Sequence, residues 1–198
     1  MPKKKPVMLF VCTGNTCRSP MALIIAQEML GDDYICKSAG SNVTKSDFSF
    51  KVNVSLKNLR FENVKDTKTV RISQELLDEA DMVFCLGTNV LEAVNKKFPS
   101  SAKKVFKYAP NRYKVPDPLD MQGFHYSEVG ELLKISNCKD GHDLQGSQVS
   151  YDFVAKMMRD VFMPQVKIKI ENHFRNLKSI NLTGIHLLKP KDMQDSKL

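Results

Sequence analysis

The chain opens on a short apolar run, followed by a polar loop and then by apolar side chains at helical spacing. Residues 6–12 are rich in strand-forming residue types, and residues 19–30 carry the helical pattern. Ser19 suits the N-cap of this helix, and Gly31 suits its C-terminal stop. Residues 34–38 form a second predicted strand, parallel to the first because a helix connects the two.

The middle of the chain alternates between the same two patterns. Residues 41–71 carry the weakest pattern, and we expect one helix there, at about 50–60. Four further elements are marked by caps and apolar runs. They are a helix from its N-cap Ser73 to Ala80, a strand at 82–86, a helix from Thr88 to Phe98 that Pro99 ends, and a strand at 104–108. This alternation predicts an α/β fold: a single domain with a doubly wound parallel four-stranded sheet and helices on both faces.

The last third of the chain begins with loop-like sequence. A proline-marked loop occupies 109–121, and the polar, glycine-containing stretch 122–149 has the character of an insertion. We expect the domain to span 6–180 and residues 181–198 to form a C-terminal tail.

A final helix is expected from Ser150 or Tyr151, because apolar side chains recur at helical spacing after that point. Pro164 has no backbone N–H, so it should kink or break this helix. Helical spacing continues over 165–180.

The charge balance of the chain points to an anionic partner. Its 198 residues suit one domain, and a hydrophobic share of 42% supports a core. Lysine and arginine number 30 against 22 aspartates and glutamates, a net charge of +8. This excess favours a phosphorylated protein, an acidic surface or nucleic acid. No base-stacking or recognition-helix pattern is visible, so we expect a phosphorylated protein partner and no nucleic acid.

Cysteine usage indicates a reducing compartment. The five cysteines, at positions 12, 17, 36, 85 and 138, form no C-x-x-C pair, so we expect no metal and no cofactor. The apolar run at 7–11 is too short for a signal peptide or a membrane span. We therefore expect a cytoplasmic protein, without a membrane span and monomeric.

The candidate chemistry lies in the loop between the first strand and the first helix, CTGNTCRS at residues 12–19. Such a loop points several backbone N–H groups at one spot, where the helix dipole adds positive potential and favours an anion. Gly14 should let the backbone turn inward at low steric cost. The expected phosphate-binding residues are Thr13, Gly14, Asn15, Thr16, Cys17, Arg18 and Ser19.

A nucleophile and a phosphate clamp bracket this loop. The Cys12 thiol faces the predicted anion site and should ionise readily, because the thiolate is the anion that the loop stabilises. The Arg18 guanidinium can hold two oxygens of a phosphate at once. The pattern predicts phosphoryl transfer to sulfur and excludes the nucleotide-binding P-loop, because no Gly-Lys-Ser/Thr follows. The alternative is a buried strand-end cysteine beside a surface arginine.

Residues 11–22, VCTGNTCRSPMA, resemble the signature of the low-molecular-weight protein tyrosine phosphatase family. Ser38-Ala39-Gly40 after the second strand and Asp117-Pro118 further on fit the same family. The resemblance is good over about 6–40, weaker over 72–120, and poor over 41–71 and 121–150.

The resemblance implies a role for each site residue. Cys12 would form a phosphocysteine intermediate, and Arg18 would stabilise the charge that builds on the phosphoryl oxygens. Asp117 matches the family's general acid, which protonates the leaving group and then activates water, with Asp120 as a fallback.

Three neighbouring residues have expected supporting roles, those of Ser38 and Cys17 by the same resemblance. Ser38 would buttress the loop together with Asn15. Ser19 could donate a hydrogen bond to the Cys12 sulfur as well as cap the helix. Cys17 could close a reversible disulfide with the nucleophile under oxidation.

The resemblance implies phosphotyrosine as the substrate but leaves alternatives open. Leu119 and Asp120 stand where the family carries aromatic residues; Tyr113, Phe124 and Tyr126 lie close by in sequence. Thr16 matches the related protein arginine phosphatases, whereas tyrosine-specific members commonly carry a bulky aliphatic residue there.

Two less favoured functions belong to other classes of protein. Thiol-coupled arsenate reductases share the loop, but they relay oxidation through a further pair of cysteines, and Cys85 has no partner nearby in sequence. A non-catalytic phosphoprotein-binding module would require a lost nucleophile or acid, and both Cys12 and Asp117 are present.

Overall fold

A parallel sheet forms the centre of the protein. The computed structural model describes residues 4–61, 68–109, 115, 117–118 and 148–187, with the backbone alone for 178–187. Among these residues, one sheet has four parallel strands in the order β2-β1-β3-β4. The strands are β1 (Val7–Cys12), β2 (Ile35–Gly40), β3 (Met82–Cys85) and β4 (Val105–Lys107).

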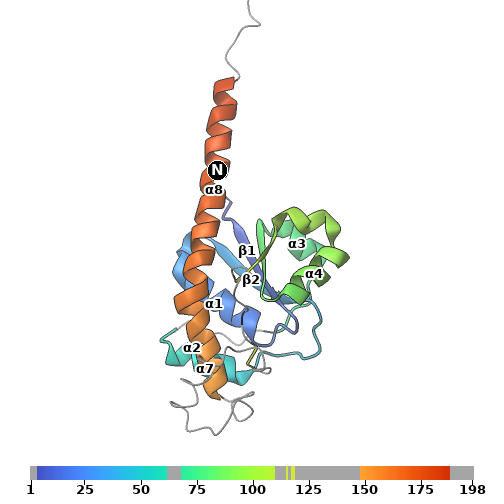
Figure 1. Ribbon diagram of the computed structural model, residues 1–198, viewed down its shortest axis with the longest axis vertical. Coiled ribbons are helices and arrows are strands. Elements are labelled where there is room, and N and C mark those ends of the chain that lie inside the picture. The colour runs from blue at the N-terminus through green and yellow to red at the C-terminus, as the bar shows by residue number, and fades with distance from the viewer. Residues whose placement is uncertain (1–3, 62–67, 110–114, 116, 119–147, 188–198) are drawn as a thin grey trace, which may run out of the picture.

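Helices connect the strands and cover both faces of the sheet (Figure 1). The described helices are α1 (Arg18–Leu30), α2 (Phe50–Asn58), α3 (Gln74–Glu79), α4 (Thr88–Lys97), α7 (Gln148–Met157) and α8 (Met163–Leu187). Shorter helical turns are η1 (Gly31–Asp33), η2 (Pro99–Lys104) and the π-helical η4 (Met158–Phe162). The predicted α/β fold with a doubly wound parallel sheet is confirmed.

The strand β1 explains why both faces need cover. Successive side chains of a strand point to opposite faces. Met8 and Phe10 join the core that contains α1, α7 and α8, whereas Leu9 and Val11 join the core that contains α3 and α4. All six β1 residues are buried, as expected of a central strand in a parallel sheet.

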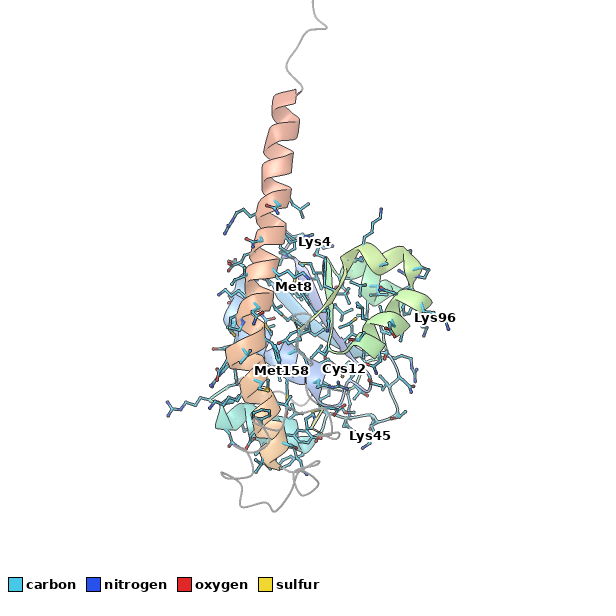
Figure 2. All side chains as sticks on the ribbon, in the orientation of Figure 1. Lys4, Met8, Cys12, Lys45, Lys96 and Met158 are labelled. Atoms are coloured by element: carbon cyan, nitrogen blue, oxygen red, sulfur yellow. The ribbon has the colours of Figure 1, made fainter. Side chains whose placement is uncertain are left out.

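The end of β1 positions the loop of interest. Cys12 pairs with Gly40 at the carboxyl ends of β1 and β2. Figure 2 shows Cys12 at the end of the sheet away from Lys4, where α1 begins. Ligands of open α/β sheets bind in the crevice outside the carboxyl ends of the strands, which is where Cys12 lies.

The cap prediction for α1 is wrong in one respect. The helix begins at Arg18, its N-cap is Cys17, and no side chain caps it. Ser19 therefore lies inside the first turn rather than at the cap. Gly31 ends the helix with φ 69°, as predicted, and Ser73 caps α3 by accepting a hydrogen bond from the Leu76 N–H.

The C-terminal helix does not break at Pro164. The chain stays helical from Gln148 to Leu187 (Figure 1). The five residues before Met163 form a π-helical turn, in which the Met163 N–H bonds to the Met158 carbonyl. In a π turn each N–H bonds to the carbonyl five residues earlier. This turn lies next to Pro164, which has no N–H, and takes the place of the predicted break.

Other boundaries shift slightly or fall outside the described residues. The second strand extends to Gly40, two residues beyond the prediction. Most of the predicted 122–149 insertion lies outside the described residues, and α8 covers 181–187 of the predicted tail. The division into domain and tail stays a prediction. None of the described helices combines the length and apolar character of a membrane span.

Candidate active site

The Cys12 sulfur lies among hydrogen-bond donors at the carboxyl end of β1. Its side chain is buried, with 3% of the residue exposed. The Asn15 backbone N–H donates to Sγ at 3.3 Å, and the Ser19 hydroxyl lies 3.0 Å from Sγ. The sulfur therefore has one backbone donor and one hydroxyl beside it, an arrangement that favours a thiolate or a bound anion.

The Ser19 hydroxyl responds to the charge on this sulfur. Its oxygen accepts a hydrogen bond from Asn15 Nδ2 at 2.9 Å and also lies 3.2 Å from the Ala39 carbonyl. A hydroxyl has one proton to donate. With a neutral thiol, Ser19 can donate to Ala39 and accept from sulfur; with a thiolate, it must donate to sulfur. Ser19 can therefore stabilise an ionised Cys12 sulfur without moving.

Asn15 holds the loop in shape. The residue is fully buried and adopts φ 55°, a left-handed conformation that asparagine tolerates better than most residues. Its Nδ2 donates to Ser19 and to Ser38, both at 2.9 Å, and its Oδ1 accepts from the Val70 N–H at 2.7 Å. The backbone donor at Val70 fixes which way the amide points. The predicted contact between Asn15 and Ser38 is present.

The glycine that the loop needs is Gly40, not Gly14. An added Cβ at Gly14 would lie 3.4 Å from Thr16 Oγ1, an ordinary contact, and the inward-turning φ belongs to Asn15. An added Cβ at Gly40 would lie 2.8 Å from the Thr13 carbonyl oxygen and 2.9 Å from the Asn15 nitrogen. Only a glycine on β2 allows the loop backbone to approach this closely. The structure gives no support to the steric role predicted for Gly14.

Arg18 and Asp117 meet at the mouth of the site. Arg18 Nη2 lies 2.6 Å from Asp117 Oδ2, with side chains 12% and 31% exposed. Arg18 Nη1 also lies 3.4 Å from the Leu86 carbonyl. The first turn of α1 thus brings the predicted phosphate clamp to the predicted general acid. The fallback Asp120 and the aromatic residues Tyr113, Phe124 and Tyr126 lie outside the described residues.

Cys17 is packed behind the loop and stays protonated. Burial raises the pKa of its thiol well above the ordinary value, and the nearby Asp117 and Cys12 raise it further. The Tyr151 hydroxyl, on α7, bonds to Cys17 and Ser49. The Ser49 N–H in turn donates to the Thr16 carbonyl at 2.8 Å. The sequence analysis missed this role of Tyr151 and named the residue only as a possible start of the final helix.

Comparison with known proteins agrees with this geometry. The family model described as "Low molecular weight phosphotyrosine protein phosphatase" matches residues 7–142. The chain belongs to this family.

Named relatives of this phosphatase-family chain carry three different activities. It is 37% identical over 108 residues to an arsenate reductase of Halalkalibacterium halodurans, covering 51% of this chain and 70% of that one. It is 31% identical over 100 residues to a protein-arginine-phosphatase of Geobacillus stearothermophilus, covering 50% and 66%. It is 23% identical over 128 residues to the low molecular weight protein-tyrosine-phosphatase Ptp of Acinetobacter johnsonii, covering 64% and 89%.

Solved structures of the phosphatase family share the fold. The YwlE arginine phosphatase from Geobacillus stearothermophilus superposes with a TM-score of 0.63 at 21% identity, covering 85% of this chain and 94% of that one. A low molecular weight protein tyrosine phosphatase from T. tengcongensis gives a TM-score of 0.61 at 25% identity, covering 83% and 99%. The fold is therefore that of the family, and the substrate is a separate question.

The phosphatase-family site described here is made of protein groups. Among the described residues, no three His, Cys, Asp or Glu side chains come together in a way that could hold a metal ion. The residues that meet at the loop are Cys12, Asn15, Arg18, Ser19, Ser38 and Asp117. They bring a thiol, a guanidinium and a carboxyl group together near the carboxyl ends of the strands.

Proposed function

We propose that this protein is a cysteine-dependent protein phosphatase that hydrolyses phosphotyrosine through a phosphocysteine intermediate. The observation that carries the proposal is the surroundings of the Cys12 sulfur. Asn15 and Ser19 contact this sulfur directly. The ion pair between Arg18 and Asp117 lies at the same end of the sheet. Membership of the phosphatase family supports the same reaction.

The first chemical step moves the phosphoryl group to sulfur. The Cys12 thiolate attacks phosphorus in line with the departing oxygen, so the S–P bond forms as the P–O bond breaks. Arg18 and the loop N–H groups hold the other phosphoryl oxygens. The leaving phenolate takes a proton from the Asp117 carboxyl group.

The second step restores the enzyme. The Asp117 carboxylate removes a proton from water as the water oxygen attacks phosphorus. The S–P bond breaks, inorganic phosphate leaves, and sulfur departs as a thiolate. Ser19 donates a hydrogen bond to that thiolate, as its 3.0 Å distance allows, and so makes sulfur a better leaving group.

Substrate binding requires a rearrangement at Arg18. The guanidinium contacts Asp117 in this structure, and the same nitrogen atoms are needed for phosphate. Phosphate therefore displaces the carboxylate, which frees Asp117 to face the leaving oxygen. The ion pair holds both groups within reach of the site before substrate arrives.

Turnover of phosphotyrosine peptides by purified protein tests the proposal. We expect wild-type protein to release phosphate, Cys12→Ser to release none, and Cys36→Ser to behave as wild type, because Cys36 lies on β2 outside the loop. Rapid acid quenching followed by mass spectrometry should find the phosphoryl group on Cys12. Activity retained in Cys12→Ser would refute the nucleophile assignment.

Phosphoarginine is the second candidate substrate. Thr16 is half-buried and places Oγ1 over the loop, 3.4 Å from where a Gly14 Cβ would stand. A small hydroxyl leaves more room than a bulky aliphatic residue and can orient a polar guanidinium or water. The arginine phosphatase relative supports testing this substrate. Side-by-side turnover of phosphotyrosine and phosphoarginine peptides decides between them.

Arsenate is the third compound to test, because one relative is an arsenate reductase. Reduction of arsenate at Cys12 needs further thiols to carry the oxidising equivalents. Cys85 is fully buried, and burial raises the pKa of its thiol to about 12, so it is a poor nucleophile. We expect no arsenate-dependent NADPH oxidation when a thioredoxin or glutaredoxin system is coupled to this protein.

A further inference from the structure

A cavity lies beside the predicted phosphate-binding loop, at the carboxyl ends of β3 and β4. Its volume is about 350 Å³, within the range of small-molecule sites. Arg18 lines it together with Cys85, Lys107 and the first residues of α4. Arg18 also borders the Cys12 site, so its side chain lies between that site and the cavity.

The charge of this cavity has one sign. Of the described residues that line it, Arg18 and Lys107 carry charge, and both are cations. Arg18 is already paired with Asp117, whereas the Lys107 ammonium forms no ion pair with another described residue. Lys107 is half-buried at the end of β4, where reduced solvent screening strengthens attraction to an anion.

The start of α4 adds donors to the same wall. Gly87 is the N-cap and offers no side chain, and the first turn of α4 contains no acidic residue. The first intrahelical bond runs from the Leu91 N–H to Gly87. The N–H groups of Thr88 and Asn89, which both line the cavity, therefore have no partner within the helix.

Cys85, at the end of β3, is also among the lining residues. The residue is fully buried, and its thiol makes no hydrogen bond to another described residue. Burial raises the pKa of this thiol to about 12, so it stays protonated and is a weak donor at neutral pH. A protonated thiol does not repel an anion in the cavity. Among the described residues that line the cavity, both charged groups are thus cations, and Cys85 adds no negative charge.

We propose that this cavity is a subsite for a carboxylate side chain of the protein substrate, two residues from the phosphorylated residue. The inference rests on the proposed function. Successive side chains of an extended peptide point to opposite sides, whereas side chains two residues apart point the same way, about 7 Å from each other. A glutamate at that spacing therefore faces the same surface of the protein as the phosphorylated residue, and it is the side chain that we place in the cavity across Arg18. Lys107 supplies the charge, and the α4 N–H groups supply the directed donors.

Two phosphotyrosine peptides of one sequence test the subsite, one with glutamate two residues before and two residues after the phosphotyrosine and one with glutamine at both positions. We expect wild-type protein to favour the glutamate peptide about fivefold, through KM rather than kcat, a typical effect of one partly screened ion pair. Lys107→Met should bring the ratio close to one, and Lys107→Glu should invert it. The matched control is Lys103→Met, an exposed lysine of η2, two residues before β4, which should keep the ratio.

Equal ratios in Lys107→Met and Lys103→Met would overturn the subsite, as would wild-type protein without a preference. Turnover of the glutamine peptide shows in the same experiment that each variant is folded. Fluorescence anisotropy of both peptides on the Cys12→Ser protein separates the two proposals. If neither peptide is hydrolysed, the proposed function fails, and the binding ratio still decides the subsite.

Discussion

Replacing Asp117 by asparagine should change turnover and phosphate binding in opposite directions, because Asp117 has two roles. The carboxylate is the proposed general acid, and it also occupies the Arg18 guanidinium that phosphate needs. Asp117→Asn keeps the shape of the side chain but removes its charge and its proton transfer. We therefore expect slower turnover together with tighter phosphate binding.

The ion pair sets the size of the gain in phosphate binding. Its atoms lie 2.6 Å apart, and its side chains are 12% and 31% exposed, so solvent screens much of the attraction. A pair of this kind contributes about 1 kcal/mol. Because 1.4 kcal/mol is a factor of ten, phosphate should inhibit Asp117→Asn about fivefold more strongly. Loss of a general acid should lower kcat by about 100-fold or more.

Steady-state kinetics with two leaving groups provides the assay. Phenyl phosphate needs a proton on its leaving oxygen more than para-nitrophenyl phosphate does, so its kcat should fall further. Asp78→Asn, an exposed carboxylate on α3, controls for the change in net charge and should leave the inhibition constant for phosphate unchanged. Weaker phosphate inhibition in Asp117→Asn, or equal losses of kcat for both substrates, would refute the reasoning.

Four further predictions concern single residues. Thr16→Ile should lower kcat/KM for phosphoarginine peptides relative to phosphotyrosine peptides, and an unchanged ratio would exclude arginine as the native choice. Cys17→Ser should prevent thiols from restoring activity after peroxide treatment, whereas wild type recovers; equal recovery would end the redox role. Asn15→Gly keeps the φ of 55° accessible but removes three side-chain hydrogen bonds; we expect chemical denaturation to show a loss of about 2–3 kcal/mol and kcat to fall. The pKa of the Cys85 thiol is raised from 9.0 to about 12, so the unfolded chain ionises first as pH rises. Wild type should therefore lose about 1 kcal/mol of unfolding free energy relative to Cys85→Val between about pH 9 and pH 10, and parallel curves would contradict this.

Local pattern was sufficient for the elements that hold the site. The apolar run of β1, the helical spacing of α1 and the stop at Gly31 agree with the structure within a residue or two. These features depend on backbone preferences and on which side chains can be buried, and both are written in neighbouring residues. The loop between them was predictable for the same reason, because a strand end and a helix start bracket it.

At Ser19 and Pro164, tertiary contacts outweighed the local preference of the residue. Ser19 has the chemistry of an N-cap, but its hydroxyl is held by Cys12, Asn15 and the Ala39 carbonyl. Pro164 should break an isolated helix, but the chain stays helical, with Met163 and Val166 in the core on either side of it. Burial of these side chains outweighs the local cost, which a π-helical turn absorbs.

The sequence by itself determined the order of strands and helices and the loop CTGNTCRS with its cysteine and arginine. Only the tertiary structure decided what surrounds that loop. Asn15 meets the Val70 N–H, 55 residues away, Gly40 gives the loop room on β2, and Asp117 reaches Arg18. These contacts join segments far apart in the chain, and their register follows from packing against the whole sheet rather than from preferences of adjacent residues.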